Sequence, residues 1–180
     1  MNLAASAAML SGCTTHGQTV TALENALAAT PSATRALEQW CAARGLADHP
    51  VIVAKQLKGE RAPEPADLRE RLGVPADGAL GYRHVELVCG DRVLSVAHNW
   101  YVRERLTAEM NSALDTTDTP FGKVVGPLRF TRETIDSRHG PEPTCPSDTV
   151  LSQIALLRAE SGQPLALVTE CYTAATLARR

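Results

Sequence analysis

The segment from residue 81 to residue 102, GYRHVELVCGDRVLSVAHNWYV, constrains the fold of this chain more than any other. Two runs of alternating side chains flank Gly90-Asp91, which predicts two antiparallel strands joined by a tight turn. In the first run, Arg83, Val85 and Leu87 share one face. A charged guanidinium on a core-facing strand needs an anionic partner, because an unpaired buried charge is very costly. The partner of Arg83 must come from the protein or from a ligand.

A second isolated charge lies near the C-terminus. The predicted strand from Pro164 to Thr173 contains Glu170 as its only charged residue. Because Val168 and Tyr172 flank it at the spacing of one strand face, Glu170 is expected to be buried and either hydrogen-bonded or paired. We therefore expect Arg83 and Glu170 to face each other across one pocket.

The remaining pattern indicates an α+β fold. Hairpin-linked strands and separate blocks of helices are typical of an antiparallel sheet with helices. Strands are predicted at residues 51–57, 81–89, 92–102, 128–137, 150–158 and 164–173. Helices are predicted at residues 19–29, 32–44 and 66–72, from Thr107, and from Pro120 with Asp118 or Thr119 as its cap.

Composition excludes several classes of function. A net charge of −2 and an aromatic content of 4% argue against a nucleic-acid partner. The five cysteines form no C-x-x-C pair, which argues against zinc-ribbon or thioredoxin-type chemistry. Cys89 and Cys171 fall in apolar strands and are predicted to be core residues. No residue cluster indicates a metal, and no cofactor is expected.

The N-terminal residues resemble a lipoprotein signal. Leu10-Ser11-Gly12-Cys13 follows a short run of small apolar residues and matches a lipobox, in which Cys13 would be lipidated. Residues 1–18 are therefore predicted to be a signal and tether, and residues 19–180 a single domain. This favours an exported, membrane-anchored protein over a cytoplasmic one. The alternative is an alanine-rich N-terminal helix, because no Lys or Arg precedes Arg35.

Four stretches together resemble chorismate lyase and the superfamily that shares its fold with the UTRA ligand-binding domains of transcription regulators. Residues 32–34 match the family's Ser-Met-Thr, and residues 82–87 match its strand with a substrate-binding arginine. Residues 119–123 look like its Thr-Pro-Leu-Gly-Arg, and residues 161–170 look like its Ser-Gly-Lys-Pro-Leu followed by Thr-Glu. The resemblance implies a six-stranded antiparallel sheet with helices packed on one side.

The resemblance also implies a reaction, the cleavage of chorismate to 4-hydroxybenzoate and pyruvate. Arg83 would bind the ring carboxylate and Glu170 the ring hydroxyl, while the backbone N–H groups of Phe121 and Ala33 would complete these contacts. The chain departs from the family at two positions. Asn99 stands where the family has a second arginine, and Ala33 replaces the methionine of its flap.

Three functions are compatible with these residues. The first is a chorismate lyase-like enzyme with Arg83 and Glu170 at its centre. The second is a non-catalytic module on the same fold that binds a small carboxylate, cyclic or aromatic. In the third, Arg83 and Glu170 pair with each other and have a structural role. The oligomeric state does not follow from the sequence.

Overall fold

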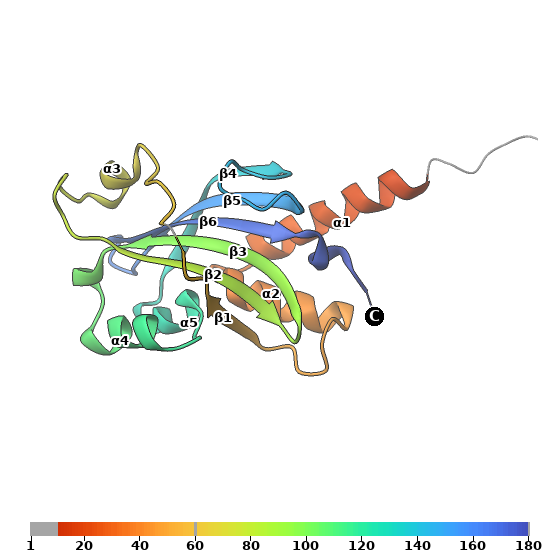
Figure 1. Ribbon diagram of the computed structural model, residues 1–180, viewed down its shortest axis with the longest axis horizontal. Helices are drawn as coiled ribbons and strands as arrows, with labels where there is room; N and C mark the ends of the chain where they lie inside the picture. The colour runs from red at the N-terminus through yellow and green to blue at the C-terminus, as the bar shows by residue number, and fades with distance from the viewer. Residues whose placement is uncertain (1–10, 60, 180) are drawn as a thin grey trace, which may run out of the picture.

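The computed structural model describes residues 11–59 and 61–179, with side chains from residue 16 onward (Figure 1). The predicted signal therefore lies largely outside the described residues. The side chain of Cys13 also lies outside them, although its backbone belongs to the first helix. No helix among the described residues is long and apolar enough to cross a membrane.

One antiparallel sheet of six strands forms the centre of the fold, as predicted. Its order is β1-β2-β3-β6-β5-β4. The strands are β1 (Ile52–Gln56), β2 (Gly81–Cys89), β3 (Arg92–Tyr101), β4 (Thr131–His139), β5 (Thr149–Arg158) and β6 (Pro164–Thr173). Gly90 turns the β2–β3 hairpin with a φ of 62°, a left-handed conformation that glycine adopts without strain.

The helices differ from their predicted bounds mainly at the ends. They are α1 (Ser11–Ala28), α2 (Ala33–Arg44), α3 (Leu68–Leu72), α4 (Ala108–Thr116) and α5 (Phe121–Val124), with 3₁₀ turns at Arg103–Arg105, Gly126–Leu128 and Ala174–Leu177. The first helix begins eight residues before its predicted start at Thr19. Ser32 and Gly45 cap α2 as predicted.

The cap predicted for α5 is wrong. Pro120 itself occupies the N-cap position and makes no side-chain cap hydrogen bond. The hydroxyl of Thr119 is instead bonded to the hydroxyl of Thr117, 2.9 Å away, within the loop that precedes the helix.

Most of the helical mass covers one face of the sheet. Figure 1 shows α2, α4 and α5 on this face, which we call the helix face, and the short α3 on the opposite, outer face. On the helix face, Leu23, Leu37, Val85 and Ala97 belong to one buried cluster that joins α1 and α2 to the sheet. On the outer face, the two leucines of α3 pack against Trp100 in a separate cluster. The helix layer and α3 together bury most of both faces of the central strands β3, β5 and β6.

The outer face carries a chain of polar contacts between rings. His84 and His98 lie opposite each other on β2 and β3, and their rings stack with centroids 4.2 Å apart. The Tyr82 hydroxyl lies 2.8 Å from Nδ1 of His98, and Nε2 of His98 lies 3.4 Å from the Thr144 carbonyl oxygen. Because a carbonyl can only accept, this network assigns the proton to Nε2 and leaves Nδ1 to accept from the tyrosine.

Acid is expected to destabilise the fold through His84 and His98. Burial lowers the pKa of both His84 and His98, and the nearby His84 lowers that of His98 further. The unfolded chain then binds more protons than the folded chain below about pH 6.5, so stability is complete above that pH and falls as the pH drops below it. Proton linkage limits the loss in the free energy of unfolding to about 1.4 kcal/mol per pH unit for each histidine.

Urea unfolding at pH 7.5 and pH 5 would measure this dependence. We expect His84→Gln combined with His98→Gln to flatten the pH profile. His49→Gln is the control, because His49 is exposed. An unchanged slope in the double variant would show that other groups cause the acid sensitivity.

Candidate functional site

A pocket lies on the helix face, between the sheet and the N-terminal ends of α2 and α5. It holds about 440 Å³ of empty space, including its open mouth. The room inside it for a water-sized group is about 40 Å³, so a ring-sized ligand would have to widen the pocket. Its walls are mostly apolar, with polar groups at a few points. The lining residues come from every strand except β1: Val85, Leu87, Ala97, Asn99, Phe130, Arg132, Leu157, Val168 and Glu170, with Ser32, Ala33, Thr34, Phe121 and Gly122 above them.

Close packing of α5 against α2 forms the roof of the pocket. A methyl group added at Gly122 would lie 3.0 Å from the Ser32 hydroxyl oxygen and 3.5 Å from that of Thr34. The missing side chain of Gly122 therefore lets the two helix starts approach each other. The first backbone N–H groups of a helix lack partners within it, so both helix starts bring free donors near the same space.

Asn99 is one of the polar side chains that line the pocket. It is 5% exposed, and its amide makes no hydrogen bond with any described residue. Because its amide atoms still reach the open space of the pocket, they can be hydrogen-bonded there by water or by a ligand. A bound molecule or water in the pocket would satisfy this amide.

Arg132, and not Arg83, is the ion-pair partner of Glu170, so the third alternative, in which Arg83 and Glu170 pair with each other, is wrong. Nη2 of Arg132 lies 2.5 Å from Oε2 of Glu170, and the Tyr172 hydroxyl donates to the same oxygen at 3.0 Å. Arg132 also bonds the side chains of Gln153 and Thr134. The pair is almost fully buried, with side-chain exposures of 4% and 9%.

The charge of this pair is balanced within the protein. Burial alone would lower the pKa of Arg132, but the charge and hydrogen bond of Glu170 raise it, so the guanidinium stays protonated. Nε of Arg132 has no protein partner in the described chain, and the hydrogen bonds of Glu170 with described side chains all use Oε2. The pair thus leaves one donor and one carboxylate oxygen for other contacts.

Arg83 is buried, at 4% exposure, but its guanidinium is bound by the backbone of a loop. Nη1 donates to the carbonyl oxygen of Thr119 at 3.0 Å, and Nη2 donates to that of Thr117 at 3.1 Å. Burial lowers the pKa of Arg83, an effect that Tyr101 and Asp118 partly oppose. Two neutral carbonyls orient this charge without cancelling it.

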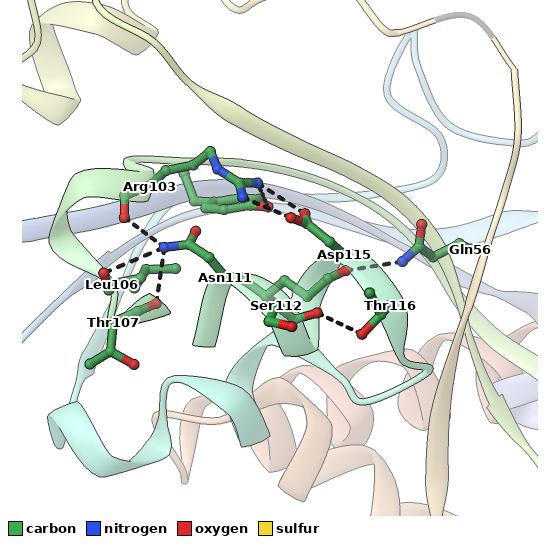
Figure 2. Close-up of polar contacts among 10 residues, drawn as sticks. Gln56, Arg103, Leu106, Thr107, Asn111, Ser112, Asp115 and Thr116 are labelled. Atoms are coloured by element: carbon green, nitrogen blue, oxygen red, sulfur yellow. Dashed lines mark hydrogen bonds and ion pairs between the residues drawn. The ribbon is translucent and has the colours of Figure 1, made fainter. Parts of the chain in front are cut away.

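Side-chain hydrogen bonds hold α4, the helix that ends next to the Thr117 carbonyl, in place (Figure 2). Arg103 makes two bonds to the Asp115 carboxylate, at 2.9 and 2.7 Å, and the Asn111 amide donates to the Arg103 carbonyl. At the same C-terminal end of the helix, the Gln56 amide donates to the Leu114 carbonyl. Since Thr117 is the C-cap of α4, Arg83 is a cation at the negative end of a fixed helix.

The predicted site residues share one face of the sheet. In the strand register Arg83 lies opposite Asn99, Asn99 opposite Val168, and Ala97 opposite Glu170. Directly opposed residues of an antiparallel pair point to the same side. Asn99, Glu170, Ala33 and Phe121 all line the pocket, whereas Arg83 lies on the same face outside the lining.

Sequence reasoning missed Arg132. It lies two residues after Phe130 and two before Thr134, an alternation that places all three on one strand face. That signal was weak, because the surrounding run FTRETIDSRH is polar and reads as an exposed edge strand. The pairing of Arg132 with Glu170 crosses β5, so it depends on the order of the strands.

Comparison with known proteins finds solved structures with a similar fold. No profile of a known protein family matches the chain. Among solved structures, the effector domain of PhnF from Mycobacterium smegmatis superposes with a TM-score of 0.55 at 12% identity, over 80% of this chain and 89% of that domain. The possible transcriptional regulator YydK from Bacillus subtilis gives a TM-score of 0.47 at 12% identity, over 68% of this chain and 58% of its own.

The chain thus has the fold of the chorismate lyase-like effector domains found in GntR-family regulators. At these identities the likeness concerns the fold alone, and the chain spans 58% of the length of YydK. In sequence, the uncharacterized protein y4mC of Sinorhizobium fredii is 40% identical over 161 residues, covering 79% of this chain and 68% of y4mC. The chain belongs to the same family as y4mC.

Proposed function

We propose that this chain is a non-catalytic module that binds a small cyclic carboxylate in the pocket beneath α2 and α5. The unpartnered amide of buried Asn99, facing a mostly apolar pocket, is the observation that carries the proposal. An apolar cavity with a few unmet polar groups suits a ligand with an apolar ring and polar groups at its ends.

Charge favours an acid over a neutral ligand. The charge of Arg132 is balanced by Glu170, whereas Arg83 is held by neutral carbonyl oxygens directly opposite Asn99 in the sheet. Of the two carboxylates near Arg83, Asp118 offsets part of its charge, and Asp115 is already paired with Arg103. The ligand carboxylate would accept from the Asn99 amide and from the N–H groups at the start of α2, a place suited to anions. A ring hydroxyl would donate to the free oxygen of Glu170.

Binding is favoured over lyase activity for two reasons. Asn99 replaces the second arginine that the resemblance implies for an enzyme, so a substrate with two carboxylates would lack one guanidinium. In addition, Arg83 is bound to the loop carbonyls. The structural relative with the higher TM-score of the two described above is named an effector domain, which supports the same choice.

Calorimetric titration with 4-hydroxybenzoate tests the proposal. We expect binding, and we expect a weaker interaction with 4-hydroxybenzamide, which has the same ring without the charge. Asn99→Leu keeps the size of the side chain and should lower the affinity about tenfold, since a hydrogen bond to a charged group contributes about 1.5–3 kcal/mol. Asn99→Asp should weaken it further through repulsion of the carboxylate.

Three outcomes would count against the proposal. Equal affinity for 4-hydroxybenzamide and 4-hydroxybenzoate would show that the site does not recognise a carboxylate. If neither of these compounds binds, the proposed class of ligand, a small cyclic carboxylate, is wrong. Formation of 4-hydroxybenzoate from chorismate, followed by absorbance, would establish the lyase instead.

A further inference from the structure

Two disulfides tie the fold together, one on each face of the sheet. Cys41 of α2 is bonded to Cys89 at the end of β2, across 48 residues of sequence. Cys145, in the loop between β4 and β5, is bonded to Cys171 of β6 across 26 residues. Cys171 follows Glu170, which faces the pocket, so Cys171 points to the outer face. The sequence placed Cys89 and Cys171 in the core, where they are buried, but did not predict these bonds.

The Cys41–Cys89 disulfide acts on the helix that roofs the pocket. The N-terminal residues Ser32, Ala33 and Thr34 of this segment line the pocket, and Cys41 lies two turns further along the same helix. Cys89 lies on β2, whose residues Val85 and Leu87 form part of the pocket floor. The disulfide is therefore a covalent link between the roof and the floor.

The other polar attachments of α2 do not reach the central strands. Trp40 and Arg44 donate to backbone carbonyls of the C-terminal segment, at Thr176, Leu177 and Ala178. Glu38 pairs with Lys123 of α5 and accepts from the backbone of Ile52 in the edge strand. Apart from apolar packing, the disulfide is what fixes α2 to β2.

We propose that the Cys41–Cys89 disulfide makes the roof of the pocket dependent on redox state, so that the pocket is complete only in an oxidising compartment. Reduction by a dithiol breaks the S–S bond and forms two thiols, while the dithiol becomes a cyclic disulfide; two electrons and two protons pass to the protein. Long-range disulfides of this kind persist in oxidising compartments and are rare in a reducing cytosol. Only the consequence for binding rests on the proposed function.

Hydrogen exchange followed by mass spectrometry tests the proposal without a ligand. The variant with Cys41→Ala and Cys89→Ala should exchange the amides of residues 33–44 at least tenfold faster than the wild type. The variant with Cys145→Ala and Cys171→Ala is the matched control, because it removes a long-range disulfide from the outer face. It should leave exchange in α2 unchanged. Equal exchange in α2 for the first variant and the wild type would overturn the proposal.

Two further measurements complete the test. If the first variant does not fold, the same exchange is compared between the oxidised and the dithiothreitol-reduced control variant, in which Cys41–Cys89 is the disulfide that remains of the two described. In protein exported to an oxidising compartment, Cys41 and Cys89 should resist alkylation until the protein is reduced, and free thiols at these two positions would contradict the proposal.

Titration with 4-hydroxybenzoate separates this inference from the proposed function. The first variant should bind at least tenfold more weakly than the control. If the wild type does not bind but α2 exchange still increases in the first variant, the proposed function fails and the redox-dependent roof stands.

Discussion

Arg132→Met is expected to lower the free energy of unfolding by about 3–5 kcal/mol, the largest effect of any single substitution predicted for this protein. The substitution leaves the Glu170 carboxylate buried in a site with 9% side-chain exposure and removes its cationic partner. The Tyr172 hydroxyl, which would remain, donates one hydrogen bond and carries no charge. Urea unfolding at pH 7.5 measures the loss.

A double variant separates the pair from its two members. Arg132→Met together with Glu170→Leu removes both charges and should recover most of the lost stability, because apolar groups often replace a buried ion pair at little cost. Arg158→Met is the control for loss of an arginine on the neighbouring strand, since its bond to Glu133 lies at the surface. If Arg132→Met alone were as stable as Arg158→Met, the burial of the Glu170 carboxylate would not depend on Arg132.

Arg83→Met is expected to lower the free energy of unfolding by about 3 kcal/mol. It removes two charge-assisted bonds to the carbonyls of Thr117 and Thr119, each contributing about 1.5–3 kcal/mol, and gains some stability from burying methionine. The loop that leads into α5 should loosen as well, because these bonds hold it to the sheet. Arg83→Lys should lose less, since it keeps the charge but not the fork of donors.

The control for Arg83 is Arg92→Met, which removes a single bond to the Leu46 carbonyl, distant from the pocket lining. Urea unfolding and 4-hydroxybenzoate titration should be measured on the same preparations. If Arg83→Met abolishes binding while stability equals that of the control, Arg83 contacts the ligand directly. That result would restore the role that the resemblance implied and contradict the structural role described here.

The candidate site was partly predictable, and the reason lies in the β period. Alternation along a strand assigned Arg83, Asn99 and Glu170 to faces, and antiparallel pairing brought those faces together. The alternation of side chains along a strand does not determine which charged residues form an ion pair. Arg132 comes from an edge strand with a polar sequence, and its pairing with Glu170 required β5 to lie between β4 and β6.

The sequence by itself determined the strands, the caps of α2 and the shared face of the site residues, because these depend on neighbours along the chain and on a period of two. Tertiary structure alone decided the partners: Glu170 with Arg132, Arg83 with loop carbonyls, and the cysteines with each other. These contacts join segments far apart in the chain, and a buried charge or thiol binds whichever suitable group the packing brings within a few ångströms.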